Sequence, residues 1–208
     1  MLDIGCGRGW FLIEAQKRGW EVYGTEYSQE AIKICESNGL KMKAGKLESD
    51  TFEPGEFDVI TSFEVMEHIN NPVEEVRNIH KFLRKGGMFY LTTPNYNAYL
   101  RYNFKEEYDI FVYPEHLTFY SKSTIKKLLT ENGFKSYKIL TTGISLSRQR
   151  PLKDSYNEER LISEKSSDEQ LRQTISNKWY LGYAKNVANK VLTVLGVGLS
   201  LKGYFIKI

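Results

Sequence analysis

Three glycines at alternate positions stand near the start of the chain, in the run Leu2-Asp3-Ile4-Gly5-Cys6-Gly7-Arg8-Gly9. The apolar residues before them predict the end of a buried strand, and residues 10–18 predict a helix that Gly19 ends. Glycine has no Cβ and tolerates positive φ, so a ligand can approach the backbone of such a turn, and the helix that follows offers free N–H groups. The chain therefore opens as an α/β fold with a ligand site at its first turn.

The next part of the chain alternates strand and helix signals, which predicts βαβ units and a parallel sheet. We expect strands at 21–25, 40–44, 57–63 and 88–92, and helices at 28–37 and 72–83, with Gly86-Gly87 ending the second helix. Residues 96–120 are rich in aromatic side chains and predict a long loop with one turn of helix. A helix from about 121 to 132 and strands at 134–142 and 203–208 complete the expected order.

Composition and charge exclude several classes of protein. The chain has 208 residues, of which 41% are hydrophobic and 26% charged, as in an ordinary globular domain. A net charge of +3 is too small to indicate nucleic-acid binding. Two cysteines and three histidines exclude a disulfide scaffold and a Cys/His zinc cage, and the histidines are far apart in sequence, so no metal site is expected. Without a signal peptide or an apolar run long enough for a bilayer, a cytoplasmic location is expected.

The domain boundaries follow from a change in composition. We assign residues 1–147 and 199–208 to the core domain, and the polar segment with its following helix, residues 148–198, to an insertion between the last two strands. The helix mixes aromatic and basic residues between Trp179 and Val194, so it can lie on a membrane surface. Packing against the sheet edge or another subunit is the preferred interpretation.

The spacing of the glycines separates two classes of cofactor. A dinucleotide site has its third glycine three residues after the second, where this chain has the bulky Trp10. The acid Asp3 at the strand end also suits a cationic ligand better than a pyrophosphate. Glu26 follows the second strand, where a carboxylate can accept hydrogen bonds from both hydroxyls of a ribose. Because NAD sites use the same device, Glu26 alone does not separate the cofactors.

The run Leu2–Gly9 resembles motif I of the class I S-adenosylmethionine (SAM) dependent methyltransferases, which reads V/L-L-D-x-G-C-G-x-G. The resemblance extends to about Phe134. It implies a Rossmann-like, doubly wound, mostly parallel sheet of seven strands with the last strand antiparallel. It also implies SAM as cofactor and S-adenosylhomocysteine (SAH) as product. Family members carry several tens of residues before this motif, so the helices that help to cover SAM are expected to be missing here.

The same resemblance implies a set of cofactor contacts. Glu26 would bind the ribose, Tyr27 would pack on the adenine or shield the strand end, and Leu47 would touch the adenine. The glycine turn would hold the methionine part, and the end of the fourth strand would face the transferred methyl group. The residues implied at the turn are Asp3, Gly5, Cys6, Gly7 and Gly9, and those at the fourth strand are Phe63, Glu64 and Val65.

Two later blocks supply candidate bases. Residues 63–69 resemble the E-V-L-E-H block of small-molecule methyltransferases, including the ubiquinone-pathway O-methyltransferases. Enzymes that methylate base amines carry an N/D-P-P-Y/F block there, so nucleic acid is not the expected substrate. Residues 113–120 resemble a P-x-H-x-x-x-F/Y block that borders the acceptor pocket. His68 and His116 are each either a catalytic base or a structural histidine, and Tyr108, Phe111 and Tyr113 either wall an acceptor cavity or form the core of a lid.

The expected activity is methyl transfer from SAM to an oxygen, nitrogen or carbon of a small, glycan-linked or lipid-linked acceptor. Such a transfer is an in-line displacement that depends on alignment, with a base where the acceptor must lose a proton. The alternatives are a SAM-binding relic or interaction module without activity and, less favoured, a nicotinamide dehydrogenase.

Overall fold

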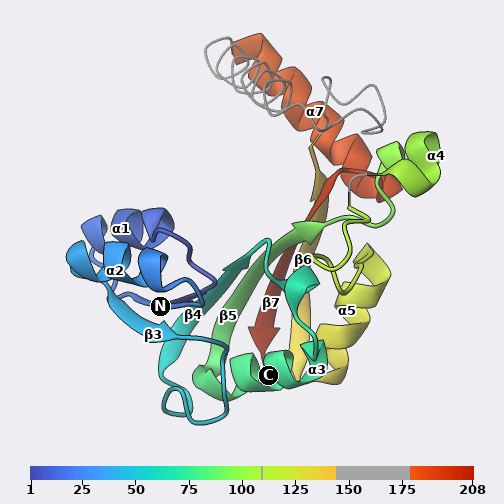
Figure 1. Cartoon of the computed structure of the whole chain (residues 1–208). Coiled ribbons are helices and arrows are strands. Elements are labelled where there is room, and N and C mark those ends of the chain that lie inside the picture. The colour runs from blue at the N-terminus through green and yellow to red at the C-terminus, as the bar shows by residue number, and fades with distance from the viewer. Residues whose placement is uncertain (109, 144–178) are drawn as a thin grey trace.

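The computed structural model describes residues 1–108, 110–143 and 179–208 (Figure 1). At its centre lies a seven-stranded sheet in the order β3-β2-β1-β4-β5-β7-β6. Every neighbouring pair is parallel except the two pairs that β7 makes, which are antiparallel. The expected fold class is confirmed. The strands are β1 (Leu2–Ile4), β2 (Tyr23–Glu26), β3 (Lys41–Ala44), β4 (Phe57–Phe63), β5 (Leu83–Pro94), β6 (Phe134–Thr142) and β7 (Ser200–Lys207).

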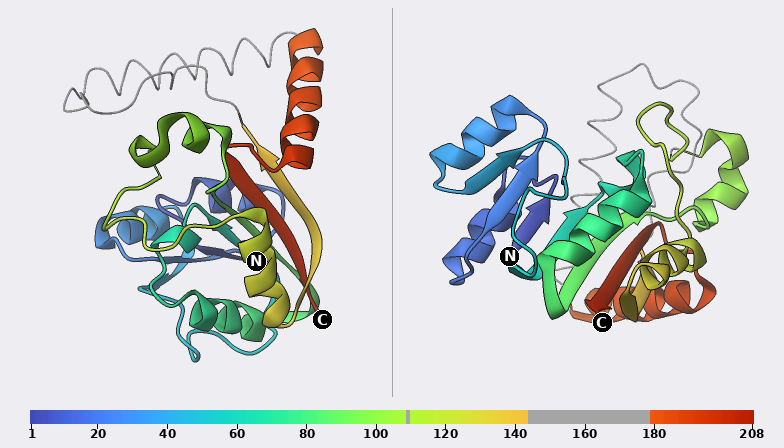
Figure 2. Two further views of the ribbon diagram at one scale, coloured as in Figure 1. Left: turned by 90° about the vertical axis from the view of Figure 1, so that its right-hand side faces the viewer. Right: turned by 90° about the horizontal axis from the view of Figure 1, so that it is seen from below.

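Helices cover the sheet on two sides (Figures 1 and 2). Helices α1 (Trp10–Lys17) and α2 (Gln29–Ser37) pack beside β1, β2 and β3, and α3 (Pro72–Phe82) and α5 (Lys122–Glu131) cover the opposite face. The reversal between β1 and β4 is therefore the topological switch point, where doubly wound folds bind their ligands beyond the strand ends. Shorter elements are the 3-10 turns η1 (Met66–His68) and η2 (Lys105–Glu107) and the helix α4 (Tyr99–Phe104).

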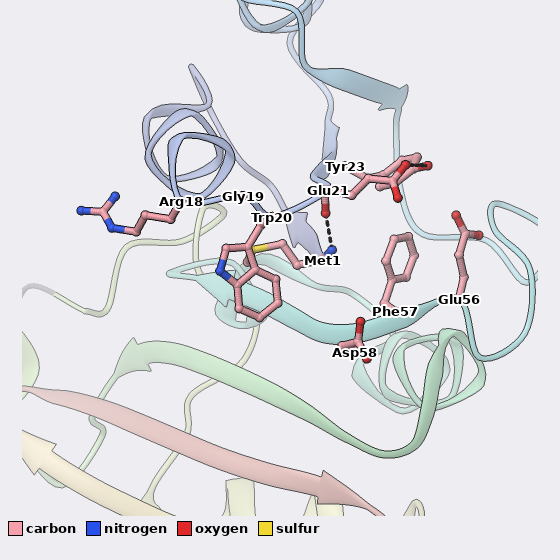
Figure 3. Close-up of a pocket in the computed structure, with 9 residues that line it drawn as sticks. All are labelled: Met1, Arg18, Gly19, Trp20, Glu21, Tyr23, Glu56, Phe57 and Asp58. Carbon is pink, nitrogen blue, oxygen red and sulfur yellow. Dashed lines mark hydrogen bonds between the residues drawn. The ribbon is translucent and has the colours of Figure 1, made fainter.

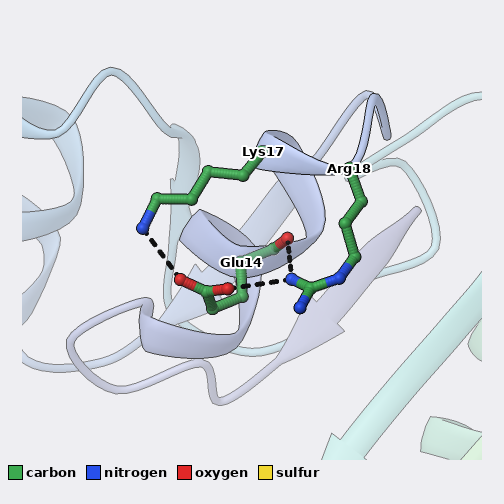
Figure 4. Close-up of polar contacts among 3 residues, drawn as sticks. All are labelled: Glu14, Lys17 and Arg18. Carbon is green, nitrogen blue, oxygen red and sulfur yellow. Dashed lines mark hydrogen bonds and ion pairs between the residues drawn. The ribbon is translucent and has the colours of Figure 1, made fainter.

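Local capping explains where these helices begin. The Ser28 hydroxyl accepts a hydrogen bond from the backbone N–H of Ala31 at the start of α2. The Ser121 hydroxyl and the Thr124 side chain form a reciprocal capping box at the start of α5. In α1, exposed Glu14 pairs with Lys17 and Arg18 one turn later (Figure 4). Such exposed pairs contribute only a few tenths of a kcal/mol each, so burial of the apolar faces is what fixes the helices.

Two hydrophobic cores hold the layers together. The larger core lies between the sheet and helices α3 and α5, and includes Ile60, Phe89, Ile79, Leu129 and Phe205, each fully buried. The smaller core lies under α1 and α2. Its buried members are Met1, Leu12, Ala15, Val22, Cys35 and Leu40.

Three predicted boundaries are wrong. Helix α3 ends at Phe82, and β5 already begins at Leu83, so Gly86-Gly87 lies inside the strand instead of ending the helix. The reason is a bulge: Leu83 pairs with Phe57 and Met88 pairs with Val59, so four residues on β5 lie opposite one on β4. Strand β7 begins at Ser200 rather than at 203. The expected long loop after β5 contains the short helix α4 followed by η2, where one turn of helix was predicted.

Helix α7 (Trp179–Leu195) comes between β6 and β7 in the chain, and only its last part touches the sheet (Figure 1). The Thr193 hydroxyl donates to the carbonyl of Thr141, and Gly143 N–H donates to Asn189. Several apolar side chains of this helix are exposed, among them Val191, Val194 and Leu195. None of the described helices is both long and apolar enough to cross a bilayer. Most of the expected insertion, residues 148–178, lies outside the described residues, so the domain boundaries stay a prediction.

Candidate active site

The glycine turn after β1 has the backbone that the sequence demands. Gly5, Gly7 and Gly9 all have positive φ, between 56° and 74°. A Cβ on Gly5 would lie 2.7 Å from Val65, and one on Gly9 would lie 2.5 Å from Leu40. A Cβ on Gly7 would meet no atom of the described residues within 4 Å, apart from its chain neighbours. Gly5 and Gly9 are therefore glycines because neighbouring segments approach them, whereas Gly7 borders open space that a ligand can enter.

Glu26 turns its side chain back toward this open position. Its Oε2 accepts a hydrogen bond of 2.9 Å from the backbone N–H of Gly7, and its Oε1 accepts from the N–H groups of Tyr27 and Ser28. These three bonds join the end of β2 to the turn after β1 and hold the carboxylate at the crevice between them. A carboxylate has about four acceptor sites, so about one stays free on Oε2, and a second hydroxyl of a ligand would share or replace one of the three N–H donors.

Asp3 lies beneath the turn rather than in the open space. The side chain is buried, and the Thr61 hydroxyl on β4 donates to its Oδ1 at 2.7 Å. Burial raises the pKa of Asp3 to about 7, against the opposing effect of the Thr61 hydrogen bond. A positive charge nearby would stabilise the ionised form of a carboxyl group with this pKa. Asp3 can therefore act on a cationic ligand through the field at the turn, without touching it.

The remaining residues assigned to the cofactor differ in placement. Cys6 packs against Gly24, where an added Cβ would lie 2.8 Å from its sulfur, and burial raises the pKa of its thiol. Tyr27 is largely exposed beside Glu26. Leu47 is buried in the larger core, and its carbonyl accepts from the Asn78 side chain at 2.8 Å. The roles assigned to these residues stay predictions, and for Leu47 the burial favours a structural part.

The end of β4 continues the same crevice. The Phe63 ring makes an edge contact with Phe11 on α1, with ring centres 4.8 Å apart. Glu64 has φ +54°, which is unusual for a residue other than glycine and is often found at functional sites. Its pKa is raised, chiefly because the surrounding protein removes water from a side chain that still reaches the surface. Val65 packs on Gly5, so the segment after β4 touches the glycine turn directly.

The fold brings the two candidate bases together. His68 in η1 and His116 in the segment before α5 have ring centres 5.0 Å apart. The backbone fixes this meeting, because the carbonyl of Glu67 accepts hydrogen bonds from the N–H groups of Leu117 and Thr118. Glu67 itself is buried, and its Oε2 accepts from Thr93 at 2.9 Å. Glu67 was not predicted as a site residue, although it lies within the E-V-M-E-H block at residues 64–68.

Backbone carbonyls determine the proton positions on both rings. His68 Nδ1 lies 2.6 Å from the carbonyl oxygen of Glu115, and His116 Nδ1 lies 2.8 Å from that of Ile110. A carbonyl only accepts, so each Nδ1 carries a hydrogen and each neutral ring keeps its lone pair on Nε2. His68 Nε2 lies 4.0 Å from the Glu67 carboxylate. The arrangement offers two imidazole rings, each with a lone pair on Nε2, beside a buried carboxyl group.

The same three side chains have the composition of a small metal site. One ligand atom each from Glu67, His68 and His116 lies within 4.8 Å of the others. Imidazole and carboxylate are ligands for zinc, iron and related ions. Two histidines that are far apart in sequence therefore meet in space. That the protein uses no metal is untested and stays a prediction.

The aromatic residues beside this cluster divide into two groups. Tyr108 is buried in a small core with Ala98, Leu100 and Ile110, which favours the lid-core interpretation for that residue. Phe111 is partly exposed and packs against Phe119, with ring centres 5.2 Å apart. Tyr113 is exposed. Phe111 and Tyr113 are thus the members of the predicted wall that a ligand can reach.

A separate hollow lies at the opposite ends of the strands (Figure 3). Its volume is about 400 Å³, and Met1, Trp20, Glu21 and Phe57 are among its lining residues. These residues precede β2 or begin β1 and β4, whereas the glycine turn and Glu26 follow the ends of β1 and β2. The hollow is therefore distinct from the candidate active site.

Comparison with known proteins adds the family. A family model described as a methyltransferase domain matches residues 1–139. The chain belongs to this methyltransferase family. Among curated relatives, a ubiquinone biosynthesis O-methyltransferase from Pseudomonas aeruginosa is 30% identical over 109 residues, which cover 48% of this chain and 47% of the relative. A protein of the same name from Coxiella burnetii is 28% identical over 168 residues, covering 71% of each chain.

The chain thus spans about half the length of the first of these relatives and more of the second. Solved structures support the methyltransferase fold. A SAM-dependent methyltransferase from Archaeoglobus fulgidus superposes with a TM-score of 0.64 at 19% identity, over 99% of this chain and 85% of that chain. The geranyl diphosphate C-methyltransferase of Streptomyces coelicolor, solved with SAH, gives 0.60 at 15% identity over 100% and 70%. The resemblance inferred from motif I is confirmed.

Proposed function

We propose that the protein transfers a methyl group from SAM to an oxygen of a small-molecule acceptor. The observation that carries the proposal is the bond between Glu26 and the Gly7 N–H, which puts a carboxylate and an open glycine at one crevice. SAM supplies a methyl group on a positively charged sulfur, which is a good leaving group. Such a transfer needs alignment and exclusion of water more than acid–base assistance to the leaving group.

The residues present fit such a ligand. Glu26 would accept hydrogen bonds from the two ribose hydroxyls, and the N–H groups of the turn would meet the carboxylate of the methionine part. Asp3 lies below that turn, and its ionised form is stabilised by a positive ligand. Phe63 and Val65 at the end of β4 would border the methyl group and keep water from it.

An oxygen acceptor must lose a proton as it attacks, and the histidine pair is arranged to take it. We assign the proton to Nε2 of His68, because the Nδ1 hydrogen is held by the Glu115 carbonyl and the Glu67 carboxylate is 4.0 Å from Nε2. The carboxylate would stabilise the imidazolium that forms. His116 would position the acceptor and the ring of His68. Relatives named as O-methyltransferases support an oxygen acceptor.

Methyl transfer from radiolabelled SAM to a panel of small phenols and catechols tests the proposal. We expect transfer to at least one hydroxyl acceptor, with SAH released in equal amount. The relic alternative predicts SAH binding without transfer to any member of the panel. A folded protein that transfers methyl groups only to amines, or to carbon, would contradict the oxygen assignment.

A further inference from the structure

A buried carboxylate near the candidate cofactor site has no partner in the described part of the chain. Glu75 lies in the first turns of α3 and is 6% exposed. Its carboxylate makes no hydrogen bond or ion pair with the described residues. The nearby Lys46 ammonium, which could neutralise it, instead lies 3.6 Å from the carboxylate of Glu48. The carboxylate oxygens are not among the fully enclosed unpartnered atoms of the described residues, so a ligand can reach this largely desolvated group and supply the missing donor.

The contacts of α3 locate Glu75 relative to the loop after β3. The Lys81 ammonium donates to the carbonyl of Ser49, and one helical turn earlier Asn78 donates to the carbonyl of Leu47. The loop therefore runs parallel to this part of the helix, and one helical turn toward the start of α3 corresponds to about two residues toward the start of the loop. One further turn places Glu75 opposite Gly45 and Lys46.

That part of the loop is joined to the end of β2. The N–H of Gly45 donates to the carbonyl of Glu26 at 2.9 Å. Tyr27, the next residue, has a raised pKa, caused first by partial burial and then by the charge of Glu75. Glu75, Tyr27 and Lys46 are thus close enough for their charges to interact, next to the end of β2 that carries Glu26.

We propose that Glu75 recognises the adenine of SAM by accepting a hydrogen bond from its exocyclic amine. The inference rests on the proposed function, since the ribose on Glu26 is what places the base over the loop at Gly45. An acceptor that is nearly buried and unpartnered is complementary to a planar ring that brings an N–H donor and excludes water. Burial also raises the pKa of Glu75 to about 7 in the protein without ligand, as expected of a carboxylate that awaits a donor.

The test compares SAH with its 6-deamino analogue, in which purine replaces adenine, by isothermal titration calorimetry. Wild type should bind SAH roughly 10- to 100-fold more tightly than the analogue, as for a hydrogen bond to a charged group. Glu75→Ala should lose most of its affinity for SAH and little of its affinity for the analogue, so that the ratio falls toward one. Glu74→Ala removes an exposed carboxylate from the same turn and should leave the ratio unchanged.

Circular dichroism and thermal unfolding establish whether the variants fold. Glu75→Gln serves as a second variant, because glutamine keeps the shape of the side chain and alanine does not. The ratio should also fall in Glu75→Gln, because the amide is uncharged. If wild type binds SAH and the ratio is the same in Glu75→Ala and Glu75→Gln as in wild type, the assignment of Glu75 is overturned while the proposed function stands. If wild type binds neither ligand, the proposed function itself fails.

Discussion

At the scale of single residues, Gly7 differs from Gly5 and Gly9 because a Cβ at this position would contact no neighbouring segment among the described residues. It shares this with Gly19, which also has positive φ and open space around it. An alanine at either position should cost about 1–2 kcal/mol of stability, because a Cβ is disfavoured in this conformation. Only Gly7→Ala should also weaken SAH binding, by about tenfold or more. Thermal unfolding and calorimetry on the two variants check this, and equal SAH affinities would contradict it.

The buried carboxyl group of Asp3 should make the free energy of unfolding depend on pH. Its pKa in the folded protein is raised from 3.8 to about 7, so the native state binds the proton more tightly than the unfolded chain. Its contribution to the free energy of unfolding is therefore greatest below about pH 4 and falls as the pH rises through 7. Asp3→Asn removes this loss and should be more stable than wild type at pH 8 by on the order of 1–4 kcal/mol.

Urea unfolding of wild type and Asp3→Asn at pH 5 and pH 8 measures the effect as a difference. The asparagine keeps an acceptor for the Thr61 hydroxyl, so the hydrogen bond on β4 is retained. Parallel pH dependences of the two proteins would show that Asp3 does not titrate in this range.

At the scale of elements, η1 and the segment before α5 meet because the Glu67 carbonyl binds two N–H groups of that segment. His68→Gln keeps a polar side chain on η1 but removes the base. With an active acceptor, we expect kcat to fall by roughly 10²- to 10⁴-fold and SAH affinity to stay within twofold. A variant that retains its kcat, or loses it together with SAH binding, would contradict the assigned role.

The sequence was most informative about these elements where a short pattern determines the backbone. The glycine turn, the acid after β2 and the order of strands follow from local signals, because a strand, a glycine turn and a helix admit few arrangements. The meeting of His68 with His116 could not be predicted, since it depends on how a long segment packs. The bulge at Gly86-Gly87 was missed for a similar reason: adjacent glycines fit a helix end and a bulge equally well. Glu75 reads as a polar residue of a surface helix until its burial is known.

At the scale of the whole molecule, α7 is attached to the sheet by a few polar contacts near its C-terminal end. The Thr193 hydroxyl donates to the Thr141 carbonyl and also lies 3.2 Å from the Thr141 N–H, and Leu192 accepts from the Thr141 hydroxyl. Thr193→Val removes one side of this pairing and should increase hydrogen exchange in α7 without changing SAH affinity. Ser123→Ala, at the start of α5, is a suitable control. Unchanged exchange in α7 would show that other contacts hold it.

The central claim is that the crevice between the glycine turn and Glu26 binds SAM. Calorimetric titration of SAH into wild type, Glu26→Ala and Glu30→Ala tests it most directly. Glu30 is exposed on α2, and its carboxylate lies 3.8 Å from Arg8, so its loss removes the same charge nearby but outside the crevice. We predict saturable binding to wild type and Glu30→Ala, and affinity at least about tenfold weaker in Glu26→Ala. Folded wild type that takes up neither SAH nor SAM, or equal binding by all three proteins, would contradict the account.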